Sequence, residues 1–362
     1  MLIEIPKYYK KIIVTGGAGF IGGCLIRKIL NKSEGEIFNI DKFGYASDLT
    51  GIDKEIELIG NKAHKRHHLI KIDISNKKLL SETIKRINPD LVFHLAAESH
   101  VDRSISGPDV FIKSNIIGTF NLLEVLRTHF ANLSTERKKI FRLHHVSTDE
   151  VFGSAEGENK FSELSPYNPK SPYSASKASS DHLVRAWQAT YQLPISISNC
   201  SNNYGPWQLP DKLIPLIITK AVRNEPIPIY GNGENIRDWL FVEDHVEAML
   251  EIALKGIQGS TYCIGGSNEY SNLKIAHLIC DFLNKELPKS KRYNDQITFV
   301  KDRPGHDFRY AIDNSFIIKE LKWQPKYTFE KALVYTIRWY LENLDWCSKF
   351  LPNKDLIRKV TN

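Results

Sequence analysis

The segment KIIVTGGAGFIG, residues 11–22, holds four glycines, of which Gly16, Gly19 and Gly22 are spaced as G-x-x-G-x-x-G. A β-branched run at 11–15 precedes the glycines, and an apolar-periodic segment at 20–30 follows them. This order predicts a strand, a tight turn and a helix. Small residues in such a turn let the backbone approach a pyrophosphate at a helix N-terminus. We therefore expect a dinucleotide to contact Gly16, Gly19, Phe20, Ile21 and Gly22.

The next predicted strand, residues 37–40, ends at Asp41, nineteen residues after Gly22. A carboxylate at that place accepts hydrogen bonds from the adenosine ribose and repels a 2′-phosphate, which favours NAD over NADP. Lys42, the next residue, is also expected at the cofactor site. Its positive charge works against this preference for NAD over NADP. A structural glycine turn with a surface aspartate is the alternative interpretation. Later strand ends supply the other expected cofactor contacts, which are Asp73, Ile74, Leu95, Ala96 and Ala97.

Strands and helices alternate up to about residue 200. Apolar runs predict strands at 69–72, 91–95, 141–146 and 195–198, with helices at 81–87, 110–128 and 173–191. The alternation is typical of parallel βαβ units, so the predicted fold class is α/β: a doubly wound, Rossmann-like parallel sheet with a smaller mixed α/β substrate lobe. The predicted boundaries are 1–198 for the NAD-binding domain, with returning segments around 235–270, 199–350 for a partly interleaved substrate-binding lobe, and 351–362 for a C-terminal tail.

Composition and charge exclude several classes of protein. The chain has 49 Lys and Arg against 42 Asp and Glu, a net charge of +7, and the excess is scattered in short runs, so we expect no nucleic-acid partner. There is no signal-peptide core and no apolar run of membrane-spanning length, so we expect no membrane association. Five cysteines without a close pair predict free thiols, a cytoplasmic location and no metal site.

Tyr173 and Lys177 lie four residues apart in a predicted helix and therefore share one face. A free phenol has a pKa of about 10, which is too high for an efficient base near neutral pH. A neighbouring ammonium and an oxidised nicotinamide stabilise the phenolate and lower that pKa. Taken alone, a tyrosine and a lysine four residues apart could equally be a pair on the helix surface without a catalytic role. The preceding dinucleotide motif favours a hydride-transfer site.

Thr148, Asp149 and Glu150 follow the predicted strand at 141–146. Parallel α/β sheets bind ligands at the carboxyl ends of their strands, so these side chains are expected in the same crevice. The alternative is a simple helix N-cap, because Ser, Thr and acidic residues are common there. With a hydride carrier nearby, an acid and a base indicate dehydration through a transient oxidation.

At this point the chain resembles the nucleoside-diphosphate-glucose 4,6-dehydratases of the extended short-chain dehydrogenase/reductase superfamily. Besides TGGAGFIG at 15–22, the matching segments are HLAAESHVDRSI at 94–105, STDEVFG at 147–153, SPYSASKASSDHLVRAW at 171–187, NCSNNYGPWQLPDKLIPL at 199–216, GNGENIRDWLFVEDH at 231–245 and DRPGHDFRYAID at 302–313. Epimerases of the superfamily share the first motif and the Tyr-Lys pair but typically lack the Asp-Glu pair.

The resemblance implies conversion of dTDP-glucose to dTDP-4-keto-6-deoxyglucose, with NAD reduced and regenerated in each cycle. It implies that Tyr173 removes the 4-hydroxyl proton while Lys177 holds the ribose and Thr148 bonds the 4-oxygen. It further implies that Glu150 removes the C5 proton and that Asp149 protonates the departing 6-hydroxyl. UDP-glucose and CDP-glucose stay open as substrates, and an NDP-sugar 4-epimerase is the more distant alternative.

The same resemblance implies contacts to the nucleoside-diphosphate hexose. Arg237 would grip the diphosphate, for which a planar guanidinium is well suited, although a surface salt bridge is the usual fate of a basic residue. The other implied contacts are Ser99, His100, Asn202, Lys212, Leu213, Asn272, Arg303 and His306. Deoxysugars of cell-surface polysaccharides are the implied products of the pathway.

Two predicted helical segments, 110–128 and 173–191, are apolar on more than one face. In the superfamily two such helices from each subunit pair into a four-helix interface, so the resemblance implies a homodimer. The alternative is that both helices only cover the sheet.

Overall fold

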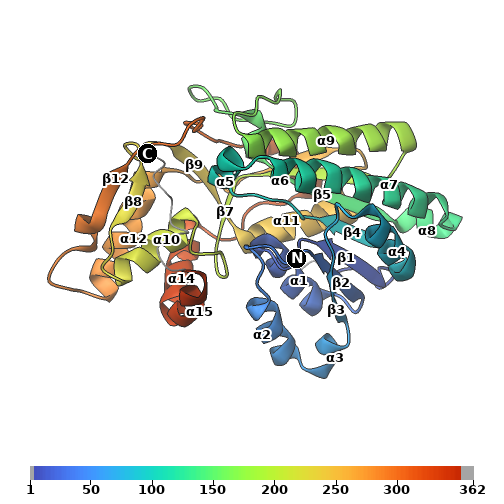
Figure 1. Cartoon of the computed structure of the whole chain (residues 1–362), viewed down its shortest axis with the longest axis horizontal. Helices are drawn as coiled ribbons and strands as arrows, with labels where there is room; N and C mark the ends of the chain where they lie inside the picture. Colours follow the sequence, from blue (N-terminus) through green and yellow to red (C-terminus); the bar gives the residue numbers. More distant parts are fainter. Residues whose placement is uncertain (1–3, 352–362) are drawn as a thin grey trace.

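The structure is a computed structural model that describes residues 4–351. Its largest element is a seven-stranded sheet with the order β10-β6-β5-β4-β1-β2-β3 (Figure 1). All neighbouring strands in it are parallel. The strands are β1 (Lys11–Thr15), β2 (Glu36–Asp41), β3 (His67–Lys71), β4 (Leu91–His94), β5 (Arg142–Thr148), β6 (Ile195–Cys200) and β10 (Thr261–Ile264). The predicted α/β fold class is confirmed.

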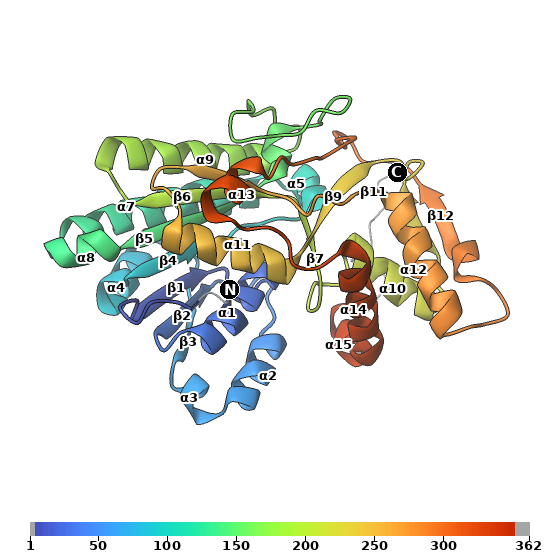
Figure 2. The same ribbon diagram turned by 180° about the vertical axis from the view of Figure 1, so that it is seen from behind.

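Helices cover both faces of this sheet, and the alternation of apolar side chains explains how. In β1, Ile12 and Val14 pack with α1 and α11 on one face, whereas Ile13 packs with α4, α7 and α9 on the other. Figure 2 shows α11 in front of the sheet, with α7 and α9 behind it. The covering helices are α1 (Phe20–Lys32), α11 (Val242–Lys255), α4 (Lys77–Ile87), α7 (Gly118–Ala131) and α9 (Pro172–Tyr191).

Shorter elements connect these layers. They are α2 (Thr50–Ile59), α3 (Asn61–His64), α5 (Val101–Ser106), α6 (Asp109–Phe111), the π-helix η1 (Ile112–Ile117), α8 (Thr135–Ile140), the 3-10 helix η2 (Asp149–Phe152) and α13 (Ser315–Leu321). The prediction of one regular helix over 110–128 was therefore wrong at its start, because the chain winds as a π-helix before α7 begins. Apolar periodicity does not reveal a local change of helical winding.

A second, mixed lobe lies at the left of Figure 1. It holds the sheet β11-β9-β7 and the pair β12-β8, around a core that includes Ile217, Ile279 and Ile337. Its strands are β7 (Asn202–Tyr204), β8 (Ile227–Tyr230), β9 (Ile236–Phe241), β11 (Glu269–Ser271) and β12 (Ile297–Val300). Its helices are α10 (Leu213–Val222), α12 (Asn272–Glu286), η3 (Tyr293–Gln296), α14 (Phe329–Glu342) and α15 (Leu344–Phe350).

The chain crosses between the lobes more than once. After β9 in the second lobe it returns through α11 and β10 to the large sheet, and then leaves again through β11. The domain boundaries remain a prediction, and the tail predicted at 351–362 lies outside the described residues except for its first residue. Across residues 4–351, none of the helices combines the length and the apolar content that a membrane span requires.

Candidate active site

A cavity of about 340 Å³ opens at the carboxyl ends of the large sheet's strands and reaches the second lobe. This is where doubly wound sheets bind ligands, since the strand order reverses between β1 and β4. All the predicted cofactor residues line the cavity, from the glycine turn to Ala97, together with Tyr173 and Lys177. Thr148, Asp149 and Glu150 line it as well, so the motifs predicted to act together do share one cavity.

The glycine turn provides the close backbone approach that a pyrophosphate needs. Gly16 has a φ of +72°, and a Cβ there would lie 2.7 Å from the backbone nitrogen of Ala96. A Cβ on Gly22 would lie 2.2 Å from the carbonyl oxygen of Gly16. Gly19 is the N-cap of α1 and leaves the first N–H groups of the helix uncovered by a side chain. These N–H groups are suited to an anionic phosphate.

Asp41, at the end of β2, is held firmly at the cavity wall. One carboxylate oxygen accepts the N–H of Phe43 and the hydroxyl of Ser47 at 2.8 and 2.9 Å, and the other accepts the N–H of Ala18 at 3.1 Å. The ammonium of Lys42 lies 2.6 Å from Glu98. Because its charge is paired, Lys42 offers less attraction to a 2′-phosphate, which supports the NAD-type reading of Asp41.

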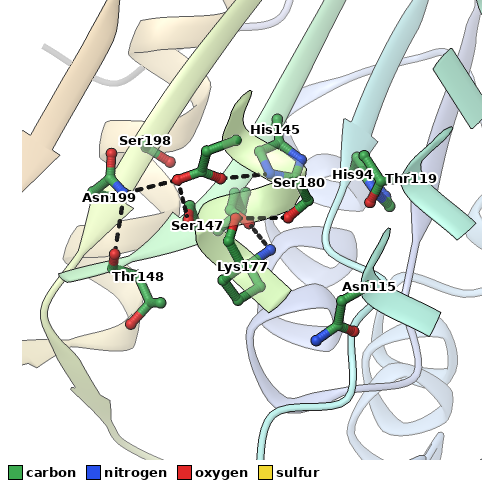
Figure 3. A network of polar contacts seen from close by, with 12 residues as sticks. His94, Asn115, Thr119, His145, Ser147, Thr148, Lys177, Ser180, Ser198 and Asn199 are labelled. Atoms are coloured by element: carbon green, nitrogen blue, oxygen red, sulfur yellow. Dashed lines mark hydrogen bonds and ion pairs between the residues drawn. The ribbon is translucent and has the colours of Figure 1, made fainter. Parts of the chain in front are cut away.

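Helix α9 presents Tyr173 and Lys177 from its first two turns. Ser171 caps it with a capping box shared with Ser174, and Pro172 occupies the first helical position. Lys177 is buried, and its ammonium donates to the carbonyl of Val146 at 2.9 Å (Figure 3). The helix start is therefore fixed against the end of β5.

The pKa of Tyr173 differs from the sequence-based expectation. Burial, followed by the Glu150 carboxylate, raises this pKa well above its usual range, while a hydrogen bond with Thr148 acts in the opposite direction. Lys177 alone therefore does not bring the pKa of the Tyr173 phenol near neutral pH. The expected activation needs the second contribution named above, the positive charge of an oxidised nicotinamide.

Asp149 and Glu150 begin η2, with Thr148 as its N-cap. The Thr148 hydroxyl accepts the N–H of Glu150 at 3.2 Å and donates to Asp149 at 3.3 Å. Thr148 therefore does cap a helix, as the alternative interpretation of this segment predicted. Capping does not explain why Asp149 is only 1% exposed, with Oδ2 lacking a hydrogen-bond partner among the described residues.

The two carboxyl groups differ in their proton affinity. Burial, followed by the charges of Glu150 and Asp238, raises the pKa of Asp149 well above its usual range. Burial also raises the pKa of Glu150, but the guanidinium groups of Arg303 and Arg237 oppose that rise. The arrangement favours a proton on Asp149 and a negative charge on Glu150.

The predicted substrate residues divide into two groups. Ser99, Asn202 and Lys212 line the cavity, whereas His100, Leu213, Arg237, Asn272, Arg303 and His306 stand outside its lining. Arg237 is buried, lies over the Tyr310 ring at 4.3 Å, and donates to His306 at 2.8 Å.

The other residues outside the lining mostly have partners within the protein. Arg303 pairs with Asp102 at 3.4 Å, and His100 lies 3.3 Å from Asp211. The backbone N–H of Asn272, at the start of α12, donates to Asn235. Leu213 opens α10. Direct contact of this second group with a ligand stays a prediction.

The sequence reasoning missed Cys200, which lines the cavity at the end of β6. Its thiol donates to the carbonyl of Ser147 at 3.4 Å and accepts from Asn203 at 3.5 Å. The side-chain oxygen of Asn203 meets Nδ1 of His245 at 2.9 Å. The position of Cys200 at the end of a parallel strand was the signal that could have identified it.

Comparisons with known proteins show which family the chain is similar to. The family model for GDP-mannose 4,6 dehydratase matches residues 13–336. The chain is 49% identical to a dTDP-glucose 4,6-dehydratase of Shigella flexneri over 345 residues, covering 93% of this chain and 94% of the relative. It is 48% identical to the dTDP-glucose 4,6-dehydratase of Neisseria meningitidis serogroup B, covering 94% and 96%.

Solved structures show the same likeness. A dTDP-glucose 4,6-dehydratase from Streptomyces venezuelae, with NAD bound, matches with a TM-score of 0.84 and 36% identity, covering 94% of this chain and 99% of that one. The dTDP-glucose 4,6-dehydratase from Bacillus anthracis in complex with NAD matches with a TM-score of 0.79 and 38% identity, with the same coverage.

Proposed function

Because the chain belongs to the nucleoside-diphosphate-sugar 4,6-dehydratases, we propose that it removes water from dTDP-glucose to give dTDP-4-keto-6-deoxyglucose. The observation that carries this proposal is the pair of the buried Asp149 and the partly buried Glu150, which share one cavity with Tyr173 and Lys177. Hydride transfer alone needs only Tyr173 and Lys177. Elimination of water needs an acid and a base as well.

NAD fits the cofactor side of this cavity. The glycine turn would hold the pyrophosphate, and Asp41 would accept the hydroxyls of the adenosine ribose. The residues that follow β3 and β4 would contact the rest of the NAD molecule. They are Asp73, Ile74, Leu95, Ala96 and Ala97. When bound, the cofactor supplies a hydride acceptor and, later in the cycle, a hydride donor.

Tyr173, Thr148 and Lys177 act at the 4-position of the hexose. Tyr173 takes the proton of the 4-hydroxyl, and Thr148 donates to the 4-oxygen. Lys177 holds the nicotinamide ribose and keeps a positive charge beside the phenol. The burial of Tyr173 and Lys177 excludes water from the reacting atoms.

Glu150 and Asp149 carry out the elimination once C4 is a ketone. The ketone acidifies the C5–H bond, and Glu150 removes that proton. Asp149 gives its proton to the 6-hydroxyl, which departs as water and leaves a C5–C6 double bond. C5 then regains a proton from Glu150 as a hydride adds to C6, which gives the 4-keto-6-deoxy product. The higher proton affinity of Asp149 supports these roles, because a general acid must hold its proton at working pH.

The basic and amide groups of the second lobe face the nucleotide. Asn202 and Lys212, which line the cavity, and Arg237, Asn272 and Arg303, which stand outside its lining, would hold the diphosphate. Ser99, His100, Leu213 and His306 complete the proposed substrate site.

Assembly as a homodimer is part of the proposal. Helices α7 and α9 lie side by side on the outside of the sheet (Figure 1), and the adjoining elements expose Val110, Ile112 and Ile117. An exposed apolar face of this kind is typical of an interaction site. Light scattering should give twice the mass of the chain, and Ile112→Glu should shift it towards that of one chain. We also place the protein in the cytoplasm, since its five cysteines are free and buried.

A panel of dTDP-, UDP-, CDP- and GDP-glucose tests the reaction. Mass spectrometry should show the loss of one water from dTDP-glucose first, and the Glu150→Gln variant should form that product far more slowly. A 4-epimerase would give a product of unchanged mass. Absence of water loss from all four sugars, in protein that retains NAD, would contradict the proposal.

A further inference from the structure

Asp181 lies on α9 one turn after Lys177 and two turns after Tyr173, so the three side chains share one helix face. It is fully buried, with 0% exposure, and it does not line the cavity itself. A buried carboxylate is costly unless hydrogen bonds and a counter-charge compensate for the lost water. The proposed chemistry gives this residue no role.

Four donors from three different segments converge on the Asp181 carboxylate. Oδ1 meets Nε2 of His145 at 3.0 Å. Oδ2 accepts the hydroxyls of Ser147 and Tyr167 at 2.7 and 2.8 Å, and the amide of Asn199 at 3.3 Å. Figure 3 shows this arrangement around His145, Ser147 and Asn199. The carboxylate therefore connects α9 with β5, β6 and the loop before α9.

One of these contacts leads directly to the reacting strand end. The amide of Asn199 that faces Asp181 also donates to the carbonyl of Thr148 at 3.0 Å. Ser147, which donates to Asp181, precedes Thr148 in the chain. Asp181 thus anchors the backbone on both sides of the peptide that carries the Thr148 side chain.

The second consequence concerns the charge of Lys177. The titratable groups whose charges interact with it are His94 from β4, His145 from β5, Cys200 from β6 and Asp181 from its own helix, and Tyr173 lies one turn before it on that helix. Burial lowers the pKa of both histidines, which keeps them neutral, and raises that of Cys200 to a value that keeps the thiol protonated.

Asp181 is the group in this set that remains negative. Burial would raise its pKa, but the bonds from His145 and Ser147 and the charge of Lys177 hold it below the usual range. In turn, burial lowers the pKa of Lys177 and the charge of Asp181 opposes that change. The two charges support each other in the interior.

We propose that Asp181 is a positioning residue that keeps the Lys177 ammonium charged and fixes the strand end bearing Thr148. Its kinetic consequence rests on the proposed dehydratase function. The loss of its charge should weaken Lys177 as a cation without touching substrate or cofactor.

The pH profile of Asp181→Asn tests this role. The amide has the same size but no charge, so Lys177 should lose its proton at lower pH and the alkaline limb of kcat should move down by about one pH unit. At a pH one unit above the alkaline midpoint of the wild-type enzyme, kcat of the variant should therefore be about tenfold lower than kcat of the wild type. Tyr167→Phe is the matched control, because it removes one hydrogen-bond donor to Oδ2 of Asp181 and leaves the negative charge of Asp181 in place. Its profile should keep the wild-type limb. Equal profiles for Asp181→Asn and Tyr167→Phe would overturn the proposal.

A thermal double-mutant cycle covers the case in which Asp181→Asn does not fold, and it needs no turnover. Asp181→Asn should lower the unfolding midpoint strongly in the wild-type background and clearly less beside Lys177→Met, where no buried cation is left without its partner. Equal losses in both backgrounds, including failure of both to fold, would contradict the charge pairing. An inactive wild-type enzyme with a positive cycle would reject the proposed reaction and retain the Asp181–Lys177 pairing.

Discussion

Two buried carboxyl groups interact with residues at the end of β5, Asp149 in the cavity and Asp181 in the interior, and they differ in how many donors reach them. Asp149, on the cavity side, has one oxygen with no partner in the described part of the chain, and burial raises its pKa well above the usual range. Asp181, on the interior side, receives four hydrogen bonds and has a lowered pKa despite complete burial. Burial alone therefore does not determine proton affinity; the donors around the carboxylate do.

This contrast suits two different tasks. A carboxyl group that lacks donors binds a proton tightly and can deliver it to a leaving hydroxyl. A carboxylate enclosed by donors stays charged over a wide pH range and serves as a fixed electrostatic support. Substitutions around the two carboxyl groups should accordingly affect different measurements.

The largest effect is expected on the cavity side. Glu150→Gln should lower the rate of water elimination by roughly a hundred- to ten-thousand-fold, because the glutamine side chain cannot accept the C5 proton. Mass spectrometry of the product from dTDP-glucose measures this loss. Glu156→Gln, at an exposed glutamate on the following loop, is the control and should retain wild-type turnover. A Glu150→Gln variant with full activity would remove the base from the mechanism.

On the interior side, His145→Leu should reduce the free energy of unfolding by about 1–3 kcal/mol, because Oδ1 of Asp181 loses its donor while remaining buried. Urea denaturation followed by circular dichroism measures this change. His68→Leu removes a histidine from a partly exposed pair with Glu36 and serves as the control. An unchanged stability for His145→Leu would mean that the imidazole contributes nothing to holding the carboxylate.

Asp149→Asn should move the unfolding midpoint in the direction opposite to Asp181→Asn, by a few degrees at neutral pH. The folded-state pKa of Asp149 is raised, so its contribution to stability is complete below the unfolded value near 3.9 and is lost as pH rises through the folded value. Removing the group should therefore stabilise the protein at pH 7.

Asp181 follows the opposite rule. Its folded-state pKa is lowered, so its contribution is present above the unfolded value and disappears as pH falls through the folded value. Differential scanning calorimetry of both variants at several pH values compares the two signs directly. Shifts of the same sign at pH 7 would show that the two carboxyl groups do not differ as described.

The smallest effect is expected for Tyr167→Phe, which removes one of the four donors to Asp181 and leaves the charge in place. The loss should be about 1 kcal/mol in the free energy of unfolding. Urea denaturation measures it beside His145→Leu. A loss larger than that of His145→Leu would place the main support of the carboxylate on the loop before α9 and not on β5.

The cofactor side could be predicted from the sequence because its signals are local. The glycine spacing, Asp41 and the small residues at 95–97 each follow an apolar run whose end is visible in the sequence, and all of them line the cavity. The strand at 141–146 extends further than predicted, to Thr148. Its polar end is compatible with burial because Ser147 finds Asp181 inside the protein.

The interior support could not be predicted in the same way. The helical spacing places Asp181 on the face of Tyr173 and Lys177 but does not reveal its partners, since His145, Tyr167 and Asn199 lie 36, 14 and 18 positions away. The position of Arg237 was similarly hidden, because its contacts with His306 and Tyr310 depend on how β9 meets a later loop.

The capping of α9 has a consequence for the phenol itself. Since Ser171 and Pro172 start the helix, Tyr173 stands in its first turn, where the aligned peptide dipoles leave a partial positive charge. That field favours phenolate over phenol by about 0.3–1 kcal/mol. The backbone of α9 therefore adds a modest electrostatic contribution of its own, which requires no ionisable side chain and stays constant at every pH at which the helix is folded.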